Sequence, residues 1–260
     1  MKLPFKLLTT LFLFAQLLSN PAFALTLTDK EATIFAEKIW QNEGAGKSKY
    51  LTHWNKHETF ASLGMGHFIW YPASVTNRPY QESFPALLAF YRQKNVAIPS
   101  WLNQVTHNPW ASRAAFYADF NNDRLTELRQ WLKTTFPTQA RFILKRYESA
   151  LSLLLKSTDK TLKGNLKEKL NTLRQTPHGL YIMMDYVNFK GEGISSKERY
   201  QGKGWGLLQV LDAMPNNSTQ PYRDFVKAAD FVLTRRVLLA PKEESQWLPG
   251  WRKRLDTYLP

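Results

Sequence analysis

The sequence places one carboxyl group, that of Glu43, at the end of an apolar helical stripe. Apolar residues recur at offsets of three and four from Ala32 to Ile39, the spacing of one helix face, and Glu43 is the next position on that face. Thr28 and Glu31 have the spacing of a capping box, which predicts where the helix begins. Desolvation and the negative end of the helix dipole both disfavour an ionised Glu43. A carboxylic acid that stays protonated near neutral pH is what a general acid needs, whereas a solvent-facing glutamate would have no such role.

A second motif follows this helix. Gly44 belongs to a residue type that tolerates positive φ, and it predicts the end of the helix. After an irregular polar stretch, positions 62–67 read SLGMGH. The two glycines lie between apolar and aromatic runs, and this pattern predicts a tight β-hairpin.

Together these two motifs resemble the lysozyme-like superfamily, most closely its phage-type muramidases. Those enzymes have a first helix that ends in Glu-Gly, followed by a hairpin that carries Thr-x-Gly-x-Gly-His. Here the matching residues are Glu43-Gly44 and positions 62–67, so the resemblance covers about forty of the 260 residues. The chain departs from the pattern because Ser62 replaces the threonine, the gap between the motifs is longer, and no aspartate lies between them.

The resemblance implies a mainly α, lysozyme-like helical domain with a small β-hairpin near the N-terminus, and a glycoside hydrolase that acts on peptidoglycan. Glu43 would protonate the glycosidic oxygen, Ser62 would hold the attacking water, and His67 would contact the substrate. Glycoside hydrolysis requires a second group that handles water or developing positive charge. Glu58 is the only acidic residue between the two motifs, so it is the candidate for that role.

A glycine-rich stretch in the second half of the chain competes for the catalytic acid. Positions 206–210, GLLQV, resemble the Gly-Leu-Met-Gln-Ile strand of lytic transglycosylases, in which a catalytic glutamate lies about fifteen residues upstream, near Glu192. Glu192 leaves fewer than seventy residues after it, too few for the helices of such a domain, so we favour Glu43. We interpret this loop as a wall of the sugar site, with contacts from Asn188, Glu192, Trp205 and Gln209. A purely structural glycine-rich turn is the alternative.

The rest of the chain reads mainly as helices. Apolar periodicity predicts helices over 83–93 and 109–120, another after Asn122, a long one after Pro137 and a buried one over 180–188. We predict a signal peptide over residues 1–24 and a single catalytic domain over 25–260. The signal consists of Lys2 and Lys6, a short apolar stretch and an Ala-Phe-Ala cleavage site.

Composition limits the partners. The formal net charge of +14 falls to +12 without Lys2 and Lys6, which favours anionic polymers or surfaces. Export argues against nucleic acid, and no cysteine is present to ligate a metal or act as a nucleophile. His53, His57 and His67 fit no metal-binding spacing, so we predict no metal and no cofactor. Two further clusters, Arg235–Arg236 and Arg252–Arg254, are interpreted as solvated faces.

The sequence therefore predicts an exported, periplasmic or secreted, monomeric muramidase that contacts the membrane only through its export signal. Two alternatives stay open. One is a lytic transglycosylase, with the acid in the later loop at Glu192. The other is a non-enzymatic cell-wall-binding protein on a lysozyme-like scaffold, which would have no need of an acid on the apolar helix face.

Overall fold

The computed structural model describes residues 25–260 except 159 and 197, so the predicted signal peptide lies outside the described residues. The fold is mainly helical, as predicted, with 60% helix and 6% strand. Within the described part of the chain, no helix is both long and apolar enough to cross a membrane.

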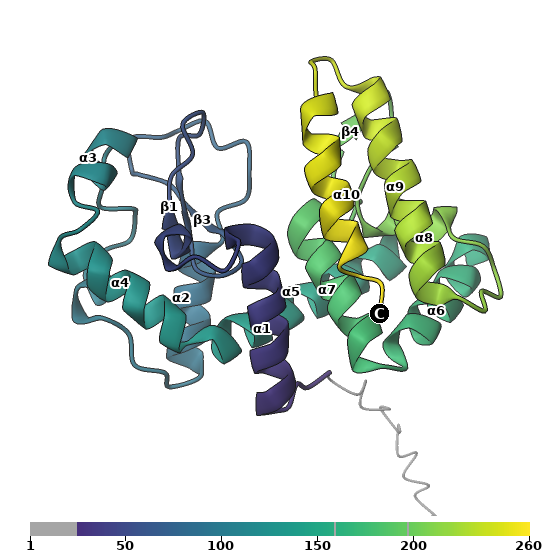
Figure 1. Cartoon of the computed structure of the whole chain (residues 1–260), viewed down its shortest axis with the longest axis horizontal. Helices are drawn as coiled ribbons and strands as arrows, with labels where there is room; N and C mark the ends of the chain where they lie inside the picture. Colours follow the sequence, from purple (N-terminus) through teal and green to yellow (C-terminus); the bar gives the residue numbers. More distant parts are fainter. Residues whose placement is uncertain (1–24, 159, 197) are drawn as a thin grey trace, which may run out of the picture.

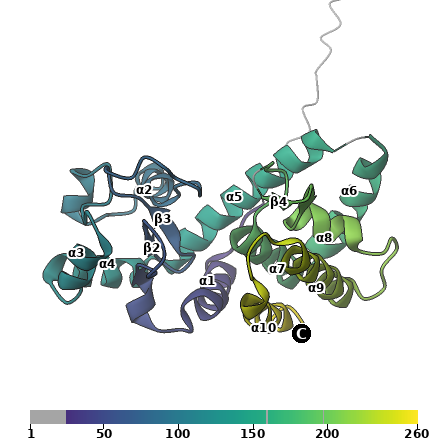
Figure 2. The same cartoon turned by 90° about the horizontal axis from the view of Figure 1, so that it is seen from above.

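Two groups of elements are joined by one long helix, α5 (Phe136–Ser157), as Figures 1 and 2 show. The N-terminal group contains β1 (Thr52–His53), β2 (Ala61–Leu63), β3 (Phe68–Trp70), α2 (Phe84–Gln93), α3 (Arg113–Ala118) and α4 (Asp123–Thr134). The C-terminal group contains α6 (Lys160–Arg174), α7 (Pro177–Lys190), β4 (Arg199–Tyr200), β5 (Lys203–Gly204), α8 (Leu207–Ala213), α9 (Pro221–Leu239) and α10 (Leu248–Asp256). Helix α1 (Asp29–Gly44) packs on α5 and α7 and so lies between the two groups.

Helix α1 begins and packs as its sequence predicts, but it ends differently. Thr28 and Glu31 form both bonds of the capping box, and Ala32 and Ile39 are fully buried. Gly44 is still helical, and the positive φ at the C-cap belongs to Ala45, at 49°. Gly44 instead allows close packing, because a Cβ there would lie 3.2 Å from the Trp40 ring, which would have to move by a few tenths of an ångström.

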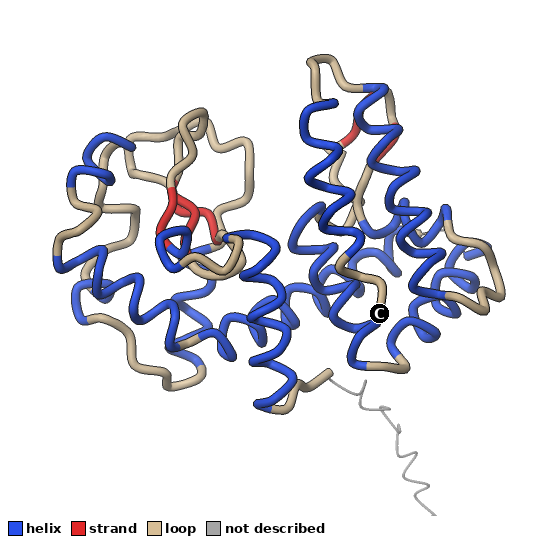
Figure 3. The backbone as a smooth tube through the Cα atoms, in the orientation of Figure 1, coloured by secondary structure: helices blue, strands red, loops and turns tan. Residues whose placement is uncertain are grey.

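The predicted hairpin is confirmed as the β2–β3 pair, in a three-stranded antiparallel sheet of order β1-β2-β3 (Figure 3). Its turn contains two residues with positive φ, Gly64 at 75° and His67 at 50°. The buried Gln139 of α5 anchors the turn by accepting from the Met65 N–H at 2.8 Å. A Cβ on Gly64 would lie 2.5 Å from the Gln139 oxygen, so only glycine allows this approach.

Two local predictions are wrong in detail. Helix α3 starts at Arg113 and not at position 109, because Ser112 caps it and the Asn108 side chain instead bonds the Trp70 carbonyl. Positions 206–210 resemble a strand in sequence but open helix α8. The reason is that the Gln209 side chain accepts from the Gly206 N–H and satisfies a free donor at the helix start.

Candidate functional site

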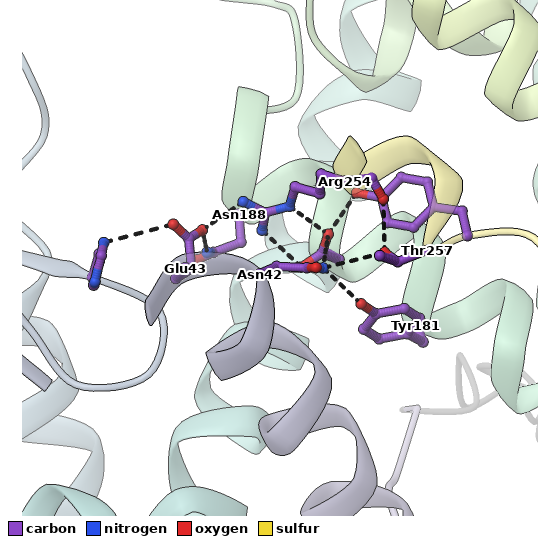
Figure 4. A network of polar contacts seen from close by, with 9 residues as sticks. Asn42, Glu43, Tyr181, Asn188, Arg254 and Thr257 are labelled. Atoms are coloured by element: carbon purple, nitrogen blue, oxygen red, sulfur yellow. Dashed lines mark hydrogen bonds and ion pairs between the residues drawn. The ribbon is translucent and has the colours of Figure 1, made fainter. Parts of the chain in front are cut away.

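Glu43 lies where the end of α1 meets α7 and α10, a place we call the junction (Figure 4). Its Oε1 accepts from Arg254 Nη1 at 2.9 Å and from Asn188 Nδ2 at 3.2 Å. Its side chain is 18% exposed, so solvent still reaches the carboxylate. The structure thus brings two predicted site residues, Glu43 and Asn188, into direct contact.

Arg254 is the residue that the sequence analysis missed, because its cluster was interpreted as a solvated face. Its side chain is only 7% exposed, and Nε and Nη2 each donate to Asp185 at 2.8 Å. Asp185, on the buried helix α7, is fully inaccessible and also accepts from the Tyr258 hydroxyl. The interpretation also fails for Arg236, which pairs with Glu244 at 2.8 Å, whereas Arg252 is half exposed as predicted.

The prediction of a raised pKa at Glu43 is wrong. Burial is the largest influence and favours the neutral acid, but Arg254, His67 and Lys190 together with the hydrogen bond from Arg254 outweigh it. The pKa of Glu43 therefore lies below its ordinary value, and the unliganded site holds a carboxylate near neutral pH. The pKa of Arg254 is raised well above its ordinary value, since Asp185 and Glu43 overcome the opposing effect of burial.

His67 faces Glu43 from the β2–β3 turn. Its Nδ1 lies 3.6 Å from Glu43 Oε2, and its Nε2 is buried without a hydrogen-bond partner among the described residues. The positive φ of His67 and the anchored turn fix this approach. The hairpin and the helix end therefore meet, as their pairing in the sequence predicts.

Ser62 and His53 lie on the sheet face that continues from this turn. The two residues are directly opposite each other in the β1–β2 register, so their side chains share one face. The His53 ring stacks on His67 with centroids 6.3 Å apart. Ser62 is 7% exposed. Four polar side chains therefore follow one another from the helix end to the sheet: Glu43, His67, His53 and Ser62.

Glu58 does not join this group. In the described part of the chain no hydrogen bond or ion pair links its side chain to Glu43, and its carbonyl accepts from Trp54 Nε1 at 2.9 Å. It is half-buried near Tyr71, and burial raises its pKa. None of these contacts tests the catalytic role predicted for Glu58, which stays a prediction.

The later loop also separates its candidates from Glu43. Glu192 interacts electrostatically with Arg146 of α5 and with Glu198. Trp205 is 7% exposed and covered by Tyr200 and Arg236, while Gln209 Nε2 donates to the Gly193 carbonyl at 3.0 Å. Trp205 and Gln209 therefore have internal roles that stabilise the loop, whereas Asn188 reaches the junction.

Other parts of the molecule offer less chemistry. A cavity of about 300 Å³ lies between α2 and α5 and is lined by Glu82, Phe90, Lys145 and Arg146, but not by Glu43 or His67. No cluster of three metal-ligating side chains occurs among the described residues.

Comparisons with protein-family models, with curated proteins and with solved structures found no match to this chain.

Proposed function

We propose that this protein cleaves glycosidic bonds in peptidoglycan and that Glu43 is the proton donor. One observation carries the proposal: a partly exposed carboxyl at the end of α1 is held by Arg254 and Asn188 and faced by His67 of the hairpin turn. The contact between helix end and hairpin agrees with the resemblance to phage-type muramidases. The basic net charge suits an anionic cell-wall polymer.

The lowered pKa of Glu43 decides when it can act. A proton donor must carry its proton at the start of the reaction, so activity should rise on the acid side of neutrality. Burial is the largest influence on this carboxyl and favours the neutral acid. A bound glycan that removes the remaining water from Glu43 therefore raises its pKa in the complex. The proton then passes to the glycosidic oxygen as the bond to the sugar breaks.

A second candidate function is glycan binding without cleavage. The observation that favours it is the same ion pair, because a carboxylate paired with Arg254 is a good acceptor for sugar hydroxyls but a poor acid. The two functions differ in one outcome, namely whether the glycan strand is cut.

The test is a digest of purified peptidoglycan with the purified protein, between pH 4 and pH 8, followed by mass spectrometry of the products. We expect cleavage, and we expect Glu43→Gln to reduce it by more than about a hundredfold, the low end of what a positioned proton donor contributes. Glu37→Gln is the matched control, since Glu37 is exposed on the same helix. Binding without products would favour the second function, and a dead Glu192→Gln beside an active Glu43→Gln would move the acid to the later loop.

A further inference from the structure

The sheet beside Glu43 carries a histidine that the proposed reaction has not yet used. His53 lies on β1 opposite Ser62, and its ring stacks on His67 at an interplanar angle of 24°. His67 in turn reaches Glu43 at 3.6 Å. Among the described residues, no second carboxylate is bonded to Glu43, His67 or Ser62. A water that attacks a sugar at this site needs a group that takes its proton.

The hydrogen bonds of Tyr117 select one tautomer of His53. The Tyr117 hydroxyl lies 3.1 Å from His53 Nδ1, accepts from the Trp54 N–H at 3.2 Å and lies 3.2 Å from the Trp54 carbonyl. The hydroxyl has one proton, and the carbonyl can only accept it. All three contacts are hydrogen bonds when Nδ1 carries the imidazole proton and donates to Tyr117. Nε2 then has a free lone pair and no partner among the described residues.

The groups around His53 keep the ring neutral. Burial, His67 and Arg113 all lower its pKa below the ordinary value of about 6.5. Tyr50 presents its ring edge-to-face, with centroids 5.6 Å apart. The neutral form is the one that can accept a proton.

We propose that His53 is the general base of the reaction, the role that a second carboxylate has in most glycosidases. Water forms a bond to the anomeric carbon while its proton passes to Nε2 of His53. The bond between the anomeric carbon and the glycosidic oxygen breaks, and Glu43 donates its proton to that oxygen on the leaving sugar. Solvent then removes the proton from His53 and returns one to Glu43. This inference rests on the proposed function, and it requires products with ordinary reducing ends.

The test compares His53→Ala and His53→Asn with the parent on soluble, uncross-linked peptidoglycan strands. The asparagine amide lies at the position of Nδ1 and can still donate to Tyr117, so this variant keeps the local hydrogen bond but cannot take a proton. His57→Ala is the matched control, because His57 is exposed in the loop that follows β1. The kcat of the parent, which reports the pKa values of the complex, should fall at low pH, as His53 gains a proton, and fall towards alkaline pH, as Glu43 loses one. Both His53 variants should lose about a hundredfold or more, and their residual activity should lack the acid-side fall.

Three results would overturn the inference, and they differ from one another. Variants that keep the parental rate and acid-side fall would show that His53 takes no proton. Anhydro ends from the parent would show that no water attacks, which refutes His53 as the base but leaves Glu43 as the acid. Intact strands with the parent would refute the proposed function itself.

Discussion

Replacing Asp185 with asparagine tests whether the buried ion pair holds the site together. Asp185 is fully inaccessible and neutralises Arg254 through two bonds of 2.8 Å. Removing one partner of a buried pair costs about 3–5 kcal/mol. Asparagine keeps one oxygen acceptor and Glu43 still faces the cation, so we expect the lower figure, about 3 kcal/mol. For a protein of this length that corresponds to a fall in Tm of roughly 6–12 °C.

The same change should alter Glu43. With Asp185 neutral, Arg254 has one carboxylate left, and the pKa of Glu43 should fall further. The alkaline limb of the pH–activity profile should therefore move to lower pH. Thermal unfolding followed by circular dichroism measures the first effect, and peptidoglycan digests across pH measure the second. Asp230→Asn, which breaks the exposed pair with Arg252, is the control and should leave Tm nearly unchanged. An Asp185→Asn protein that melts with the parent and keeps its pH profile would refute this reasoning.

Three further predictions concern stability. Glu43→Gln should destabilise the fold by about 1 kcal/mol above pH ~4.3, because the lowered pKa of Glu43 means that its ionised form stabilises the protein. The difference in stability between variant and parent should vanish as the pH falls through the folded-state pKa of Glu43. An unchanged Tm at pH 7 would contradict this prediction. Gly64→Ala should cost about 2–3 kcal/mol of stability, because alanine disfavours the positive φ and the hydrogen bond from Met65 to Gln139 is lost. Gly202 has the same φ of 75° but no atom within 4 Å of an added Cβ, so Gly202→Ala should cost only the strain of the positive φ. Equal melting temperatures of the two variants would argue against the anchored turn. Glu58→Gln should raise Tm slightly at pH 7, since burial raises the pKa of Glu58 and its ionised form is disfavoured, and a lower Tm would reveal a partner.

The features that the sequence predicts correctly are those decided over a few residues. The capping box joins Thr28 to Glu31, and the hairpin depends on Gly64 and its neighbours, so the residue types alone carry the signal. The approach of His67 to Glu43 could be predicted only through the resemblance. The strand expected at 206–210 failed because the Gln209 side chain caps a helix there.

The features that the sequence could not predict depend on contacts across long separations. Arg254 lies 211 residues from Glu43, and Tyr117 lies 64 residues from His53. One signal was available: Asp185 is the only charged residue in the apolar run LYIMMDYVNF, and a carboxylate buried on a helix needs a cation. It could have indicated a buried arginine or lysine, but the chain has 35 such residues and nothing local distinguishes Arg254.

The sharing of Arg254 between two carboxylates explains how Glu43 can be paired and still serve as an acid. If Glu43 were the sole partner, protonating it would leave a buried cation uncompensated, at a cost of several kcal/mol. Asp185 binds the guanidinium through two nitrogens and Glu43 through only one. A proton on Glu43 therefore leaves Arg254 neutralised and costs one hydrogen bond to a charged group, about 1.5–3 kcal/mol, which the exclusion of water by a bound glycan can offset. On this reasoning Asp185 is a positioning residue that keeps Arg254 in place and makes the protonated form of Glu43 accessible.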